Sequence, residues 1–289
     1  MNDISIFVDK CSDIPNIKDY PEIKTIPIYY YFNGEDIEYG DEKNLTMREI
    51  FNKMRTGAMP RTAAVNTSKA VELFEEDLTK GNDIICICLS SGLSSSYNNI
   101  VIAKNMLQKK YPDSKIAVID SLTGSLAEGL IALKALNMKK EGKNYEEIIT
   151  YINKYKDYYN IEFFVDDLTY LIHGGRISKT AASLGQLLRV KPLINIDEFG
   201  KVQVVEKVRG SKRMNSILID RMLSKIDEND IDSIGIVHSD NLDGAVKLQE
   251  NVENLKITGK YILTEIGPVI ASHIGPGGYG LTYKMKNKK

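Results

Sequence analysis

The sequence predicts an α/β protein of two domains, the first built on a mostly parallel sheet with helices on both faces. Its 289 residues exceed the usual size of a single hydrophobic core. In the first half, short apolar segments alternate with polar turns and helical segments, which is the order of βαβ units. In the second half, two apolar segments flank a short loop at Phe199-Gly200, which indicates antiparallel pairing. We therefore expect domains over residues 1–160 and 161–289, the second with a mixed sheet and helices.

Composition limits the classes of function. Hydrophobic residues make up 43% of the chain and charged residues 27%, close to the averages of globular proteins. The formal net charge of −1 provides no overall field to attract nucleic acid, so we expect no nucleic-acid partner. No apolar stretch approaches eighteen residues, and the N-terminus lacks the pattern of a signal peptide. We therefore expect a cytoplasmic protein.

The sequence predicts neither a metal site nor a phosphate-bearing cofactor. Cys86 and Cys88 alternate with isoleucine in a strand-like segment, so we expect both on one side of a strand, packed in the core. There is no Cys-x-x-Cys pair, and the three histidines are scattered. No Gly-x-x-x-x-Gly-Lys-Ser/Thr or Gly-x-Gly-x-x-Gly loop follows the first strand.

Local patterns predict the elements of the first half. Asn33-Gly34 after an apolar run predicts a hairpin. Thr46 and Glu49 form a capping box for a helix that ends at Gly57. Strands are expected over residues 4–8, 26–32, 83–89 and 115–119, and further helices after Asn66, from about Ser94, and over residues 122–140 and 145–159.

The second half has its own pattern. Strands are expected over residues 163–165, 192–196, 202–208, 233–237, 261–266 and 281–285, and helices over residues 214–226 and 243–255. Residues 269–278 form a polar, glycine-dense segment before the last strand. We expect the strand at 202–208 to pair with the strand at 192–196.

A serine-rich loop, residues 90–96, lies between a buried strand and a helix. Open α/β sheets bind ligands at this position, and free backbone N–H groups favour an anion. The alternative is that Ser94 or Ser95 only caps the helix. A nucleophilic serine is less well supported, because Gly92 has no second glycine to complete a Gly-x-Ser-x-Gly elbow.

A second candidate lies at the end of a short helical turn, residues 173–178. Gly174 and Gly175 permit a positive φ or the close approach of another group, which holds Arg176 at a rigid corner. The alternative is that the glycines only end the turn, and that His173 and Arg176 are solvated surface residues. His238 is interpreted as structural.

Taken in order, the motifs of this chain resemble those of the DegV family over nearly its whole length. The resemblance is carried by Asp9 with Ser12-Asp13, Arg61-Thr62, residues 90–94, Asp120-Ser121, residues 168–178, residues 191–193, residues 209–213 and residues 273–277. It implies two α/β domains that bind one long-chain fatty acid between them. It further implies presentation of that ligand to a separate fatty acid kinase, which makes the acyl phosphate, and no catalysis by this chain.

The resemblance also assigns the residues of the head-group site. The carboxylate-binding hydroxyls fall on Thr62 and Ser94 and the contacting histidine on His273, with Gly92, Ser95 and Gly275 beside them. Hydroxyls and an imidazole N–H can satisfy a buried carboxylate without a further fixed charge. The chain departs from the family at residues 63–65, Ala-Ala-Val instead of Ser-Gln-Pro, and at Ser95-Ser96 instead of Gly-Thr.

Arg176 is assigned to recognition of the kinase, because the glycines before it would leave the guanidinium free to project outward. Arginine binds phosphate and carboxylate through a bidentate fork. Other basic residues could extend this surface, namely Lys179, Arg209, Lys212 and Arg213. We also expect transient membrane contact for exchange of the fatty acid.

Two other functions are compatible with the sequence. One is a serine-dependent acyl hydrolase that uses Ser94 with His273. The other is a regulatory protein that senses lipid.

Overall fold

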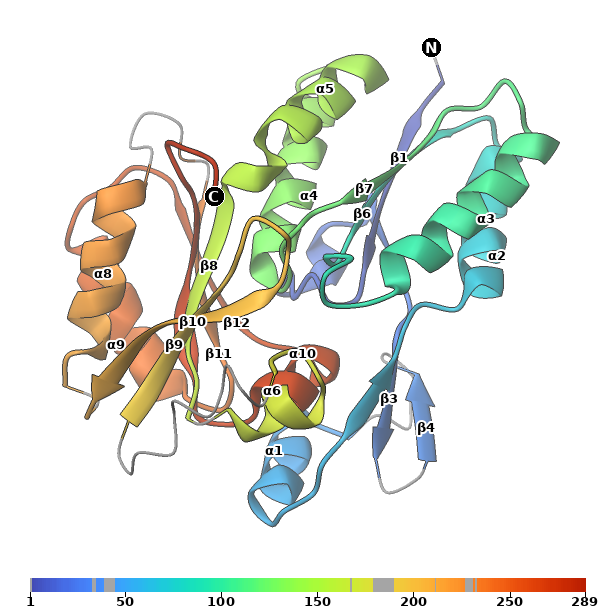
Figure 1. The fold of residues 1–289 in the computed structure, drawn as a ribbon. Coiled ribbons are helices and arrows are strands. Elements are labelled where there is room, and N and C mark those ends of the chain that lie inside the picture. Colours follow the sequence, from blue (N-terminus) through green and yellow to red (C-terminus); the bar gives the residue numbers. More distant parts are fainter. Residues whose placement is uncertain are drawn as a thin grey trace.

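The computed structural model describes residues 2–32, 35–38, 45–166, 168–178, 190–210, 212–226, 231 and 233–289. These residues form one four-stranded, one six-stranded and one three-stranded sheet (Figure 1). The two larger sheets confirm the predicted α/β class, with a parallel sheet in the first half and a mixed sheet in the second.

The four-stranded sheet is entirely parallel, in the order β2-β1-β6-β7. Every residue of β1 and β6 is buried, as expected for strands covered on both faces. Helices α2 and α3 cover one face, and Phe74 of α2 packs edge-on against Phe7 at a centroid distance of 4.9 Å. The elements are β1 (Ile4–Asp9), β2 (Ile23–Ile26), β6 (Asp83–Cys88), β7 (Ile116–Asp120), α2 (Thr67–Leu78) and α3 (Ser96–Lys110).

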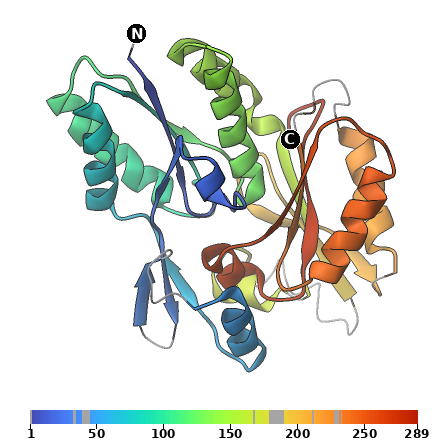
Figure 2. The same cartoon turned by 180° about the vertical axis from the view of Figure 1, so that it is seen from behind.

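Helix α4 (Leu126–Lys140) lies between the two larger sheets, beside α5 (Tyr145–Tyr155) (Figure 2). Residues on all its sides are buried, which is typical of a helix enclosed by other elements. It begins four residues later than predicted, because Leu122 and Ser125 have φ angles of 52° and 54° and cannot continue a helix. Sequence periodicity does not reveal this turn.

The six-stranded sheet has the order β10-β9-β8-β13-β11-β12. Only β11 and β12 are parallel, so the predicted mixed sheet and the antiparallel pairing of β9 with β10 are confirmed. Helices α8 and α9 cover its outer face. The elements are β8 (Tyr159–Phe164), β9 (Val190–Ile196), β10 (Val202–Arg209), β11 (Ser233–His238), β12 (Lys260–Glu265), β13 (Tyr279–Lys284), α8 (Met214–Lys225) and α9 (Leu242–Glu253).

Tyr159 and Asn160 already belong to β8, so the helix expected to reach Tyr159 is shorter. It ends at Tyr155 and is followed by a 3-10 turn, Lys156–Tyr158. The domain boundary between residues 160 and 161 stays a prediction.

The three-stranded sheet was not predicted as a separate unit. The expected strand at 26–32 is divided between β2 and β3 (Tyr29–Phe32), and β3 pairs with both β4 (Glu35–Glu38) and β5 (Arg61–Ala63). The β3–β4 pairing confirms the hairpin, while Asn33 and Gly34 lie outside the described residues. The predicted capping box opens α1 (Met47–Arg55). Strand β5, which has three residues, places Thr62 opposite Tyr30 of β3.

Two short helices complete the fold, α6 (Thr169–His173) and α10 (Pro268–Ile274). The glycine-dense segment at 269–278 therefore begins as a helix, with Pro268 in its first turn, where proline's fixed φ suits a helix. Gly275 ends it with a φ of 78°. Helix α10 packs against α6, β3 and β5 and so connects the two halves of the chain.

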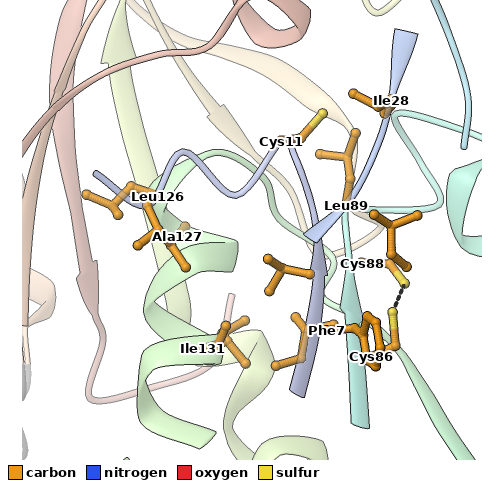
Figure 3. Close-up of a cluster of buried hydrophobic side chains, with 14 of the residues drawn as sticks. Phe7, Cys11, Ile28, Cys86, Cys88, Leu89, Leu126, Ala127 and Ile131 are labelled. Carbon is orange, nitrogen blue, oxygen red and sulfur yellow. Dashed lines mark hydrogen bonds between the residues drawn. The ribbon is translucent and has the colours of Figure 1, made fainter. Parts of the chain in front are cut away.

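The cysteines lie in the core around β1 and β6, with Cys86 and Cys88 on the face of β6 away from α4 (Figure 3). The sulfurs of Cys86 and Cys88 lie 3.6 Å apart on one side of β6, as the alternation predicts. Within the described ranges, no cluster of histidine, cysteine and carboxylate side chains is arranged to hold a metal ion. Among the helices of the same residues, none is long and apolar enough to cross a membrane.

Candidate functional site

An apolar cavity of 230 Å³ lies where the first sheet, the small sheet and the six-stranded sheet meet. Its apolar walls come from both halves of the chain and include Leu89, Leu93, Ile161, Phe163, Ile194 and Val269. Its polar lining includes side chains from β5, the serine loop, the segment after α6, and α10, namely Thr62, Ser94, Ser95, Arg176 and His273. The cavity therefore combines an extended apolar surface with hydrogen-bond donors.

Thr62 and His273 meet in the cavity wall although they are 211 residues apart in sequence. Thr62 Oγ1 lies 2.9 Å from His273 Nε2. Burial, together with the positive charge of Arg176, lowers the pKa of His273 to about 3. The imidazole is therefore neutral at physiological pH and can donate one hydrogen bond.

The other ring nitrogen of His273 is buried without a hydrogen-bond partner among the described residues. It packs against Gly174, where an added Cβ would lie 2.1 Å from Nδ1. Gly174 has an ordinary helical φ of −72°, so the residue is required for space rather than for backbone conformation. The sequence offered two reasons for the glycine pair, a positive φ or the close approach of another group. At Gly174 the reason is the close approach of His273.

Ser94 belongs to a chain of hydroxyl groups. Its Oγ accepts a hydrogen bond from the backbone N–H of Ser96 and lies 2.9 Å from Ser96 Oγ. Ser96 Oγ itself accepts from Val65 N–H and is fully buried, so its proton is best placed on Ser94. Both lone pairs of Ser94 Oγ are then used, which leaves its own proton available to a ligand in the cavity. Ser94 thus accepts from the first backbone N–H of α3, whose N-cap is Ser95, and also lines the cavity.

Arg176 does not project freely outward as expected. Its Nε donates to the carbonyl oxygen of Leu93 at 2.9 Å, its Nη1 donates to the carbonyl oxygen of Gly174, and the side chain lines the cavity. These two carbonyl acceptors fold the guanidinium back against the wall. Burial lowers the pKa of the Arg176 guanidinium from its ordinary value. The side chain brings a positive charge to the cavity, while its role in partner recognition stays a prediction.

The remaining predicted ligand residues are placed differently. Ser95 is exposed at the start of α3 and borders the cavity. Gly92 packs against the backbone of the β9–β10 turn, where a Cβ would lie 2.6 Å from the carbonyl oxygen of Gly200. Gly275 makes room for the ring of Tyr170. Neither glycine lines the cavity wall, so both act through the shape of the backbone.

Three of the other basic residues expected to recognise a partner, Arg209, Lys212 and Arg213, are exposed. Arg209 ends β10, whose other end, at Val202, lines the cavity, and Lys212 and Arg213 follow before α8. Lys179 lies outside the described residues.

Sequence reasoning did not predict Gly124 and Ser125 as part of the cavity wall. Asp120-Ser121 was noted in this loop, but nothing in the local pattern indicates that Ser125 turns into the cavity with a φ of 54°. Nor does the geometry form the dyad of a hydrolase. His273 is bonded to Thr62 and Ser94 to Ser96, and no Ser94–His273 hydrogen bond is present between these described side chains.

Comparison with known proteins identifies the class. Residues 3–286 match the family model described as "Uncharacterised protein, DegV family". The chain is 35% identical over 282 residues to a DegV domain-containing protein of Clostridium perfringens, with 96% of each chain covered. These matches, together with an α/β fold enclosing an amphipathic cavity, establish that the chain belongs to the DegV family.

Solved structures agree with this assignment. A fatty-acid-binding DegV family protein from Thermus thermophilus superposes with a TM-score of 0.87 at 25% identity, covering 98% of this chain and 99% of that one. DegV, a fatty acid binding protein from Bacillus subtilis, superposes with a TM-score of 0.84 at 27% identity, covering 99% and 100%.

Proposed function

We propose that this protein binds one long-chain fatty acid in the cavity and presents its carboxylate to a separate fatty acid kinase. The observation that carries the proposal is the combination of an apolar wall with a group of hydrogen-bond donors around Thr62, Ser94 and His273. The relatives from Thermus thermophilus and Bacillus subtilis, which bind fatty acids, support the ligand class. We place the protein in the cytoplasm, with transient membrane contact for exchange of the ligand.

Most of the affinity would come from the acyl chain. At roughly 0.8 kcal/mol per buried methylene, a chain of about fourteen methylenes gains on the order of 11 kcal/mol. The loss of ligand freedom opposes part of this gain. Apolar walls from both sheets, such as Leu89 and Phe163, are suited to enclose such a chain.

The carboxylate would lie at the polar side chains. A carboxylate withdrawn from water needs donors, and Ser94 has a free proton in the arrangement described above. Neutral His273 and the hydroxyl of Thr62 add further hydrogen-bonding capacity. Arg176 supplies a positive charge in the cavity wall that can pair with the negative charge of the carboxylate.

The kinase would approach a basic surface, for which Arg209, Lys212 and Arg213 are the exposed candidates. Positive charge at a partner interface accelerates encounter with an acidic or phosphate-bearing surface and makes the association sensitive to salt. The role of this surface is to recognise the partner, and the chain itself carries out no chemical step.

Protein purified from a bacterial host should retain a stoichiometric fatty acid, because an enclosed apolar ligand exchanges slowly. Solvent extraction followed by mass spectrometry measures it, and delipidated protein should take up added oleate or palmitate. Repeated preparations with neither bound lipid nor uptake would contradict the proposal. Hydrolysis of p-nitrophenyl esters with labelling of Ser94 by a fluorophosphonate would instead support the hydrolase.

Ser94→Ala should weaken fatty-acid binding by about 1–3 kcal/mol, roughly 5- to 150-fold, because a donor to the carboxylate is lost. Ser91→Ala is the matched control, since Ser91 is an exposed serine of the same loop that does not line the cavity. Binding is measured by titration calorimetry, and thermal unfolding separates lost affinity from lost stability. Equal affinities of the two variants would show that the head group lies elsewhere.

A further inference from the structure

Asp13 ties together three parts of the structure that are distant in sequence. Its carboxylate accepts a hydrogen bond from Ser125 Oγ at 2.6 Å and another from the backbone N–H of Gly267 at 2.8 Å. Its carbonyl oxygen accepts a hydrogen bond from Thr264 Oγ1 at 3.1 Å. The Asp13 side chain is buried, so these contacts replace water.

All three partners lead directly to the cavity. Ser125 lines its wall. Gly267 is the N-cap of α10, the helix that carries Val269 and His273 into the wall. Thr264 lies in β12, two residues before Ile266, which also lines the cavity. One carboxylate thus holds both the loop before α4 and the start of α10.

The backbone is strained at both residues of the Asp13–Ser125 hydrogen bond. Asp13 has a φ of 46°, and Ser125 combines a φ of 54° with a ψ of −147°, a conformation that residues other than glycine rarely adopt. The hydrogen bond between their side chains therefore connects two unfavourable conformations that only the folded structure can maintain.

The charged surroundings of Asp13 are acidic. Asp9 at the end of β1 and Glu128 on α4 are buried carboxyl groups that interact electrostatically with it, and the thiol of Cys11 lies in the same group. From the β12–α10 junction only the hydroxyl of Thr264 and the N–H of Gly267 bond to Asp13. Arg176 interacts electrostatically with Cys11.

The carboxyl groups of this cluster have a raised affinity for protons. Burial raises the pKa of Asp13 to about 7, against the hydrogen bonds from Ser125 and Gly267, which lower it. Burial also raises the pKa of Glu128 well above its ordinary value, and neither of its oxygens has a hydrogen-bond partner among the described residues. Near neutral pH, Asp13 is therefore poised between its two forms.

We propose that Asp13 is a positioning residue that couples fatty-acid binding to the uptake of a proton. The inference rests on the proposed function. An ionised Asp13 places a negative charge in hydrogen-bond contact with Ser125, which lines the cavity that receives the negative charge of the ligand. Two like charges in a buried site cannot both remain ionised at low cost, so the bound anion favours protonated Asp13. By reciprocity, affinity falls as the pH rises and Asp13 loses its proton.

Protonation of Asp13 keeps its hydrogen-bonded contacts with Ser125 and Gly267. A neutral carboxyl group can still accept from Gly267 N–H through its carbonyl oxygen and can donate its own proton to Ser125 Oγ. The position of α10 is kept, while the repulsion of the ligand is removed. Asp13→Asn is accordingly the closest mimic of the protonated form, because asparagine has the same shape and also tolerates a positive φ.

The test is calorimetric titration of oleate into the full-length protein at pH 7, in two buffers with different ionisation enthalpies. We expect wild-type protein to take up a fraction of a proton on binding and Asp13→Asn to take up less. From pH 6 to pH 8 the wild-type Kd should rise roughly fivefold or more relative to that of Asp13→Asn. Protonation of oleate is common to both proteins and cancels in this ratio.

The outcomes separate the two proposals. If wild-type protein fails to bind oleate, the proposed function is wrong. If both proteins bind with the same proton uptake and the same pH profile, the inference about Asp13 is overturned. Should Asp13→Asn fail to fold, Ser125→Ala gives the test. The hydrogen bond from Ser125 lowers the pKa of Asp13, so its loss should move the midpoint of the pH profile upward. An unchanged midpoint would contradict the inference.

Discussion

Arg176→Ala should lower fatty-acid affinity by about 2–3 kcal/mol, roughly 30- to 150-fold, because a partly buried carboxylate would lose its positive partner. The structure motivates this expectation, since the guanidinium is folded into the cavity wall by the carbonyl oxygens of Leu93 and Gly174. Affinity for oleate is measured by titration calorimetry on delipidated protein. A reconstituted kinase assay with lipid-loaded protein then measures acyl-phosphate formation separately.

Arg209→Ala is the matched control, because Arg209 is an exposed arginine that does not line the cavity. It should retain lipid affinity and, if the basic surface recognises the kinase, should reduce acyl-phosphate formation more at low salt than at high salt, where the charge of Arg209 is already screened. Normal lipid affinity in Arg176→Ala, combined with failure to support the kinase, would contradict a role in the cavity. It would return Arg176 to the partner-recognition role predicted from the sequence.

Gly174→Ala should weaken fatty-acid binding by about 1–3 kcal/mol, because the loss of a hydrogen bond in the head-group site costs this much. The added Cβ would lie 2.1 Å from His273 Nδ1, so the imidazole must leave the position in which its Nε2 contacts Thr62. The backbone at Gly174 suits alanine, with a φ of −72°. The effect should therefore appear in ligand affinity, again measured by calorimetry, rather than in backbone strain.

Gly175→Ala provides the opposite control. Gly175 has a φ of 71° and open space around its Cβ position, so alanine there strains the backbone without touching the site. It should lower the melting temperature but leave affinity nearly unchanged. A double variant, Gly174→Ala with His273→Ala, should bind no more weakly than His273→Ala alone, because the two changes disable the same group. Equal affinities of the two alanine variants at 174 and 175 would refute the steric argument.

The sequence by itself determined those features that depend on neighbours along the chain. The capping box of Thr46 and Glu49, the alternation of Cys86 and Cys88, and the fully buried run that became β6 all follow from hydrogen bonds or side-chain periods within a few residues. The order of such elements was sufficient for the α/β class. The motif resemblance added the candidate residues Thr62, Ser94 and His273, which the structure brings to one cavity.

The tertiary structure alone decided how these residues meet. The Thr62–His273 contact joins residues 211 apart, and the bond from Gly267 to Asp13 joins residues 254 apart, so neither leaves a local pattern. Arg176 turns inward because the carbonyl oxygens of Leu93 and Gly174 accept its N–H groups. The neighbouring glycines in the sequence do not predict the direction of its side chain. Helix α10 takes up the glycine-free start of the segment at 269–278, where it packs against α6, β3 and β5. Packing and long-range hydrogen bonds can override local preference, since their free energies exceed the fractions of a kcal/mol per residue by which propensities differ.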